Sequence, residues 1–166
     1  MSIRRLIISV LISINFDVFA ASNVDPVSIA IGRLNVNDID TVEFAYVGIR
    51  CGALNNVIGM AFQSMGSGSD RAKEIEKQYL NDAEAFKNVG FTLAVKSNQS
   101  NKYVLDQFQF FLKYYGDEWM SGHKSNNNAW TKLIAQEVES CQKVTPLFNE
   151  LSQIITENNS SKDKLK

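Results

Sequence analysis

Histidine, cysteine and proline are scarce in this chain of 166 residues, which contains one histidine, two cysteines and two prolines. These side chains are too few for a multi-histidine metal centre, a zinc ribbon, an iron–sulfur cluster or a c-type haem site, so we expect no such cofactor. The scarcity of proline, together with the lack of long alternating runs of β-branched residues, favours helices over strands.

Neither sign of charge is in excess. The 17 basic and 18 acidic residues leave a formal net charge of −1, which offers no electrostatic footprint for nucleic acid. Hydrophobic residues make up 45% of the chain and charged residues 21%, which is the composition of an ordinary folded domain. The length allows one such domain and hardly two.

The N-terminus has the layout of a cleavable signal peptide. Arg4 and Arg5 provide the positive start, and the apolar run over residues 6–14 is too short to span about 30 Å of hydrocarbon. Small residues follow, so we expect cleavage after Ala20, or after Ser22, and export to the periplasm or beyond. The alternative is an uncleaved anchor helix; after cleavage we expect no stable membrane insertion.

The remaining sequence predicts an all-α fold, an antiparallel bundle of about four main helices around one central helix. The expected divisions are the signal peptide at 1–20, a short helix and turn within 21–38, the bundle over 39–158 and a disordered tail over 159–166. The helices are expected at about 25–34, 41–63, 70–96, 102–120 and from 129 onward, the last one kinked at Pro146.

The predicted helix over 41–63 is apolar nearly all round, as a buried central helix is. It also carries a stripe of small residues that includes Gly48, Gly52 and Gly59. Because glycine inside a helix costs about 1 kcal/mol relative to alanine, we expect the stripe to admit another backbone at close range. That backbone belongs either to this chain or to a second copy, so a homo-oligomer through these glycines is one expectation. Arg50 in mid-segment argues against a membrane span.

The two cysteines, Cys51 and Cys141, each fall near the middle of an apolar helix face, and neither belongs to a C-x-x-C pair. In an exported protein this arrangement predicts one structural disulfide that joins the central helix to the last one. A catalytic thiol is disfavoured, since apolar burial raises the pKa of a thiol.

Few residues suggest catalysis. His123 is expected in a loop with no nucleophile nearby, and the carboxylates closest to the aromatic region are Asp117, Glu118, Glu137 and Glu139. Glu137 falls close to an apolar face, and a paired-carboxylate hydrolase is conceivable, although the spacing marks no particular pair. We therefore assign no catalytic residue. Arg50 is expected to form a structural ion pair with Glu43.

Aromatic residues are concentrated between positions 103 and 130. They cannot all face one core, so some are expected at a rim, where rings with one polar end favour interfaces. The predicted partner or ligand surface consists of Tyr114, Tyr115, Trp119, His123 and Trp130. The alternative is plain core packing at the open end of the bundle.

The stretch Tyr46-Val-Gly-Ile-Arg-Cys-Gly-Ala-Leu54 resembles a helix in small, uncharacterised exported proteins of marine bacteria and their viruses, in which an Arg-Cys-small-small/Leu motif recurs. The resemblance covers residues 46–54. It implies an exported helical protein and brings no activity with it.

The sequence thus favours a non-enzymatic exported binding protein whose partner is another protein, as for immunity proteins or inhibitors, since no set of nucleophile, base and orienting group can be assembled. The alternatives are a small hydrolase that uses carboxylates and a bundle that encloses a hydrophobic ligand.

Overall fold

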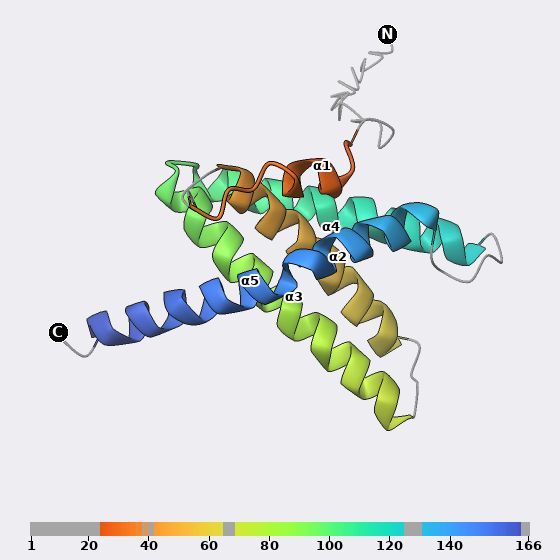
Figure 1. Ribbon diagram of the computed structural model, residues 1–166. Helices are drawn as coiled ribbons and strands as arrows, with labels where there is room; N and C mark the ends of the chain where they lie inside the picture. Colours follow the sequence, from red (N-terminus) through yellow and green to blue (C-terminus); the bar gives the residue numbers. More distant parts are fainter. Residues whose placement is uncertain (1–23, 38, 40–41, 65–68, 125–130, 164–166) are drawn as a thin grey trace, which may run out of the picture.

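The structure is a computed structural model that describes residues 24–37, 39, 42–64, 69–124 and 131–163. All regular structure in these residues is helical, as predicted (Figure 1). The elements are α1 (Val27–Ile31), α2 (Val42–Ser64), α3 (Asp70–Lys96), α4 (Asn101–Lys124) and α5 (Lys132–Asp163). The predicted signal peptide over residues 1–20 lies outside the described residues. No described helix is both long and apolar enough to cross a membrane.

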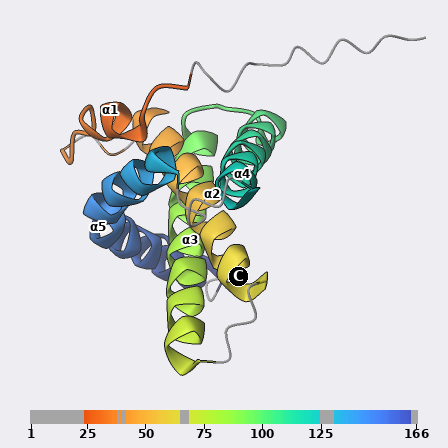
Figure 2. The same ribbon diagram turned by 90° about the vertical axis from the view of Figure 1, so that its right-hand side faces the viewer.

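Helix α2 is the centre of the bundle. It contacts all four other described helices, and buried residues lie on every side of it from Phe44 to Ala61. Figure 2 shows α4 and α5 on opposite sides of the pair formed by α2 and α3. A helix with neighbours on all sides has no face left for charged residues, which explains its nearly uniform apolar sequence.

The glycines of α2 meet α3 of the same chain. A Cβ atom added to Gly48 would lie 2.7 Å from the Cα atom of Gly90 in α3, and one added to Gly52 would lie 3.2 Å from the backbone nitrogen of Lys87. Gly59 faces the side chain of Leu80, which also belongs to α3. The close backbone approach is confirmed, and the backbone that approaches the stripe is that of α3 in the same chain.

Local sequence signals explain both ends of α3. The Ser69 hydroxyl accepts a hydrogen bond from the Ala72 amide at the start of the helix. At the other end Asn98 adopts a positive φ of 61°, and the Gln99 amide donates to the Ala94 carbonyl in a Schellman-type closure. The reversal that follows brings α4 back along α2.

Helix α4 is longer than predicted. Ser121 and Gly122 were expected to end it, but it continues to Lys124, and Gly122 is buried. A glycine inside a helix weakens it only by about 1 kcal/mol, which the packing of the rest of α4 offsets.

Helix α5 begins at Lys132, where the Thr131 hydroxyl accepts from the Ile134 amide. Pro146 lies inside it, as predicted, and the helix axis changes direction along its length (Figure 1). The expected disordered tail is wrong for residues 159–163, because α5 continues to Asp163. The Thr156 and Ser160 hydroxyls donate back to the carbonyls of Ser152 and Thr156, so the polar residues from Thr156 to Ser160 belong to an exposed part of the helix.

Helix α1 is shorter than the predicted span to Leu34. It ends at Ile31, and the amides of Arg33 and Leu34 donate to carbonyls three residues back in tight turns. Pro26 precedes its first residue, Val27, which is fully buried against the bundle. Helix α1 packs on α2 and α5.

Candidate functional site

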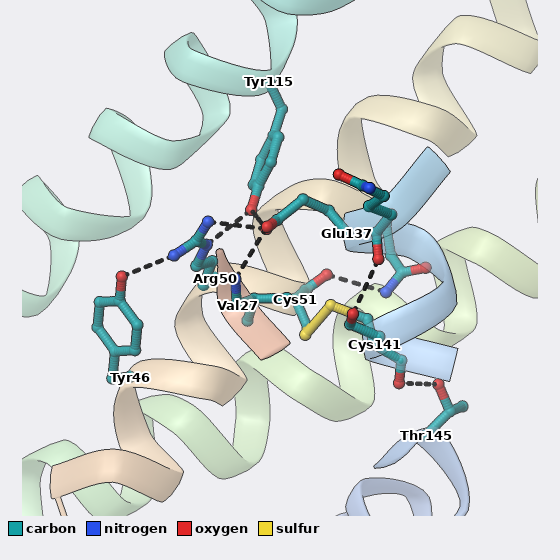
Figure 3. Close-up of a disulfide and its surroundings, with 11 residues drawn as sticks. Val27, Tyr46, Arg50, Cys51, Tyr115, Glu137, Cys141 and Thr145 are labelled. Carbon is teal, nitrogen blue, oxygen red and sulfur yellow. Dashed lines mark hydrogen bonds and ion pairs between the residues drawn. A yellow bond between two sulfur atoms is a disulfide. The ribbon is translucent and has the colours of Figure 1, made fainter. Parts of the chain in front are cut away.

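The disulfide between Cys51 and Cys141 is present, as predicted. It joins the middle of α2 to α5, with 5.7 Å between the two Cα atoms, and both cysteines are buried. The bond lies beside two charged residues, since Arg50 precedes Cys51 and Glu137 stands one helical turn before Cys141. Sulfur and charge are therefore buried together at the junction of the two helices (Figure 3).

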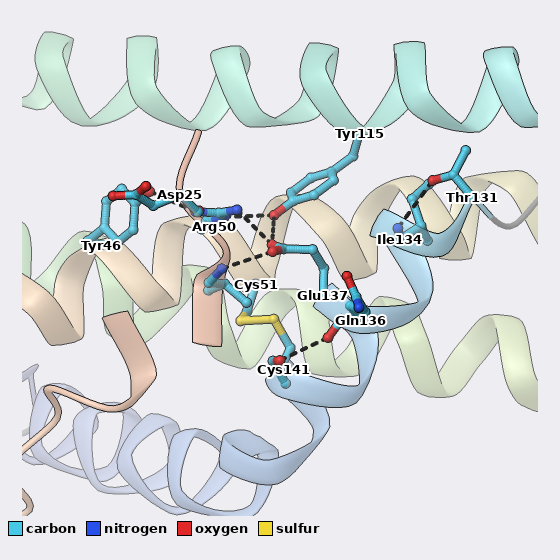
Figure 4. A network of polar contacts seen from close by, with 12 residues as sticks. Asp25, Tyr46, Arg50, Cys51, Tyr115, Thr131, Ile134, Gln136, Glu137 and Cys141 are labelled. Atoms are coloured by element: carbon cyan, nitrogen blue, oxygen red, sulfur yellow. Dashed lines mark hydrogen bonds and ion pairs between the residues drawn. A yellow bond between two sulfur atoms is a disulfide. The ribbon is translucent and has the colours of Figure 1, made fainter. Parts of the chain in front are cut away.

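Arg50 lies at the middle of a polar centre that it forms with three other side chains: Tyr46, Tyr115 and Glu137 (Figure 4). Arg50 Nη2 lies 2.8 Å from Glu137 Oε2, Nε donates to the Tyr115 hydroxyl at 2.8 Å, and Nη1 donates to the Tyr46 hydroxyl at 2.9 Å. Tyr115 in turn donates to Glu137 Oε2 at 2.6 Å. Arg50 and Glu137 are each 1% exposed, so water does not screen this ion pair.

The polar centre also holds the backbone of the N-terminal segment. Glu137 Oε1 accepts from the Val27 amide at 2.8 Å, and Arg50 Nη1 donates to the Asp25 carbonyl at 2.5 Å. Both oxygens of Glu137 are thus occupied by donors. The four helices α1, α2, α4 and α5 meet at one set of hydrogen bonds, which leaves this buried carboxylate without an open position for a substrate.

Burial and charge set the ionisation states of the centre. Burial raises the pKa of the Tyr115 phenol well above its usual value near 10, and the positive charge of Arg50 only partly opposes this effect. Burial alone would lower the pKa of the Arg50 guanidinium, but Tyr115 and Glu137 more than compensate, so this pKa is raised. The phenol is therefore a neutral donor and the guanidinium a fixed cation, and neither exchanges protons near neutral pH.

The expected ion pair of Arg50 with Glu43 is wrong. Glu43 is exposed in the first turn of α2, whereas the Arg50 guanidinium turns inward to Glu137 on α5. Sequence spacing on one helix could not show this partner, which lies 87 residues away. The position of Glu137 close to an apolar face was the one available signal, since a carboxylate buried there requires a partner.

The other candidate carboxylates lie apart from the polar centre. Asp117 pairs with Lys113 and Glu139 with Lys143, each within one exposed helix. Glu118, on α4, is half-buried. None of these three lines either of the two grooves described below.

The predicted aromatic surface is not formed as expected. Tyr115 is 0% exposed and Tyr114 is 6% exposed, so both rings belong to the core, where they pack edge to face at 5.1 Å. The reason is that α2 brings the buried Arg50, which donates to the Tyr115 hydroxyl, and that Tyr114 packs against the Tyr115 ring. Trp119 is half-buried. Trp130 and the side chain of His123 lie outside the described residues.

A groove of about 410 Å³ opens beside the polar centre, between α1, the start of α2 and the first turns of α4. We call it the α1–α4 groove. Three exposed apolar side chains line it: Ile29 is 43% exposed, Val42 is 50% exposed and Tyr103 is 50% exposed. Tyr46 and Arg50 form part of its wall. These rim residues come from three separate elements, which is why the sequence did not single them out.

One polar atom in this groove lacks a partner among the described residues. Gln99 Oε1 is buried and accepts no hydrogen bond there. Gln99 is placed by the left-handed turn at Asn98 that closes α3. A buried acceptor without a donor costs about 1–3 kcal/mol. Because this oxygen has almost no surface open to solvent, a bound group would reach it only after the Gln99 side chain turns toward the groove.

Among the described residues, no group of three or more histidine, cysteine, aspartate or glutamate side chains is placed to hold a metal ion. No protein-family model matches the chain, and no curated protein or solved structure is significantly similar to it.

Proposed function

We propose that this protein is an exported, non-enzymatic binding protein that recognises a protein partner through the α1–α4 groove. The observation that carries the proposal is the convergence of Ile29, Val42 and Tyr103 on one groove. Each of these side chains is more than 40% exposed to solvent. Apolar groups gathered at a surface hollow are characteristic of interaction sites, whereas isolated ones are common on any protein.

The polar groups of the groove suit a polypeptide. Gln99 lines the groove with an amide that can both donate and accept once it turns outward, and the Tyr46 hydroxyl accepts from Arg50 and keeps its own hydrogen to donate. A peptide bond supplies both complements, an N–H and a C=O. An apolar side chain of the same partner segment would pack against Val42 and Tyr103, as anchor residues do at protein interfaces.

The groove is built on a rigid base. Tyr46 is held by Arg50, and Arg50 by Glu137, which lies next to the disulfide on α5. Because the wall is fixed before the partner arrives, little conformational entropy is lost on binding. The buried polar centre therefore supports recognition by positioning the groove.

The first test removes the rim. The Val42→Ser/Tyr103→Ser variant should lose a partner that the wild-type protein captures, after cross-linking, from the exported protein fraction of its native cells. The control Val95→Ser/Met120→Ser removes two side chains of similar exposure that do not line the groove, and it should retain that partner. If wild type, groove variant and control capture the same proteins, the groove is not the partner site.

The second test concerns export. N-terminal sequencing of the protein expressed in its native cells should give a first residue at Ala21 or within two residues of it. Protein that retains Met1 in full would contradict export by a cleaved signal peptide.

A further inference from the structure

A second and larger groove, of about 1060 Å³, lies between α3 and the C-terminal half of α5. We call it the α3–α5 groove, and it shares no lining residue with the α1–α4 groove. Amide side chains line both of its walls: Gln78, Asn81, Asn88, Asn149 and Gln153. The hydroxyls of Ser152 and Thr156 add to them. Exposed helix faces usually carry lysine and glutamate, so this density of amides calls for a reason.

The two walls are joined by polar contacts. The Asn88 amide donates to the Ser152 hydroxyl at 3.0 Å, and the Asn149 amide donates to Asp82 Oδ1 at 3.4 Å. In each contact the asparagine donates through its nitrogen, so its amide oxygen can still accept a hydrogen bond. Asp82 has a second carboxylate oxygen that can also accept. The groove thus presents acceptors and donors in fixed positions on both sides.

Aromatic rings lie next to these polar groups. Phe91 lines the α3–α5 groove. A second hollow of about 500 Å³ shares Gln78 and Asp82 with it and is lined by Phe62 and Tyr79, whose rings stack at 6.2 Å. Along α3, the two lining residues Gln78 and Phe91 are separated by about 20 Å at a rise of 1.5 Å per residue. The polar stretch between them is long enough for several linked units of a ligand.

We propose that the α3–α5 groove binds a neutral oligosaccharide. Sugar hydroxyls both donate and accept hydrogen bonds, and the primary amides and hydroxyls that line this groove offer both functions as well. The C–H face of a sugar ring is apolar and packs on an aromatic ring such as Phe91. The charged lining residues are of both signs, three acidic and two basic, which favours a ligand without net charge.

A peptide is a poorer match for this groove. Only Ala85 and Phe91 among its lining residues are apolar, so a partner side chain would find little apolar area to bury. The glycan proposal is independent of the protein partner proposed for the α1–α4 groove, because the two grooves lie on different elements.

The test is a titration of isotope-labelled protein with maltotetraose, cellotetraose and chitotetraose, followed by nuclear magnetic resonance. At least one of these neutral tetrasaccharides should shift side-chain amide signals of the α3–α5 groove, with a dissociation constant in or below the millimolar range. Shifts caused by none of the three at about 10 mM would overturn the proposal. So would shifts confined to other parts of the protein.

Variants separate specific binding from general surface contact. Asn81→Leu/Gln153→Leu alters two exposed groove residues and should weaken binding about ten-fold or more at unchanged melting temperature. The control Gln109→Leu removes an exposed amide on α4, outside the groove, and should bind as wild type does. Equal affinity of all three proteins would refute the site.

Discussion

Helix α2 meets its neighbours in two opposite ways. At Gly48 it meets α3 backbone to backbone, because neither Gly48 nor Gly90 has a side chain to keep the helices apart. Two residues later, at Arg50, it meets α4 and α5 through one of the longest side chains available, which is buried and bound to Tyr115 and Glu137. The contact at Gly48 has no space for a side chain, whereas the contact at Arg50 depends on a long one.

The difference defines two kinds of sensitivity. The glycine crossing tolerates no added atom, since a methyl group has no space. The polar centre tolerates no removed atom, since each missing partner leaves a buried donor, acceptor or charge unpaired. Substitutions that add atoms are therefore destabilising at Gly48, and substitutions that remove atoms are destabilising at Arg50, although the two residues are two positions apart in the chain.

The largest expected effect comes from the disulfide beside the polar centre. Reduction opens a loop with a sequence separation of 90, for which the chain-entropy model gives about 4–5 kcal/mol of lost unfolding free energy. The melting temperature of the protein should fall sharply in reductant, and Cys51→Ala/Cys141→Ala should behave like the reduced protein. Equal melting with and without reductant would contradict the prediction.

Removal of one charge from the polar centre should cost nearly as much. Glu137→Leu leaves Arg50 buried without its counter-ion, which we expect to lower the unfolding free energy by about 3–5 kcal/mol in urea titrations. The control Glu139→Gln breaks an exposed pair with Lys143 and should leave the urea midpoint unchanged. Arg50→Met/Glu137→Leu should recover part of the loss. A single variant as stable as wild type would show that the ion pair is not required.

The glycine crossing can be tested by a single methyl group. Gly48→Ala places a Cβ atom 2.7 Å from Gly90 Cα, so we expect a loss of about 1–3 kcal/mol by thermal unfolding, despite the better helix propensity of alanine. Gly116→Ala is the matched control, because nothing lies within 4 Å of its added Cβ. It should be neutral or stabilising by up to about 1 kcal/mol. If both variants melt alike, the helices do not need the close approach.

The smallest effect is a dependence on alkaline pH. Burial raises the pKa of Tyr115 above the value near 10 of an unfolded tyrosine, so the folded state holds this proton more tightly. The stabilisation is complete below pH 10 and is lost as pH rises towards the folded pKa, by about 1.4 kcal/mol per pH unit for this group. Urea unfolding at pH 9, 10 and 11 should show the decline, and Tyr115→Phe should reduce its slope. An unchanged slope in the variant would assign the decline to other groups.

The helices themselves were predicted well where sequence signals are local. Residues 70–96 were expected as a helix and form α3, since Ser69 and the polar turn after Lys96 mark both ends. The ends of α4 and α5 were wrong for one shared reason: glycine and polar residues were interpreted as the end of a helix. Gly122 is instead buried within α4, and α5 remains helical to Asp163 although its residues 156–160 are exposed.

The candidate sites were predicted less well. The disulfide was predicted correctly because the chain has two cysteines, both on apolar helix faces, and two cysteines allow one pairing. The rim of Ile29, Val42 and Tyr103 was not found, since these residues come from three elements and none differs in sequence from an ordinary surface position. Tyr114 and Tyr115 were placed at a surface because helical spacing alone does not tell which flank of an aromatic helix a neighbour covers.

By itself the sequence determined the helical class, the central position of α2 and the disulfide, because these follow from periodicity, apolar content and the number of cysteines. The tertiary structure alone decided which charge Arg50 meets, which helix fills the glycine stripe and where the grooves open. Partners across a bundle depend on the rotation and crossing of each helix, which are set by the packing of all side chains together.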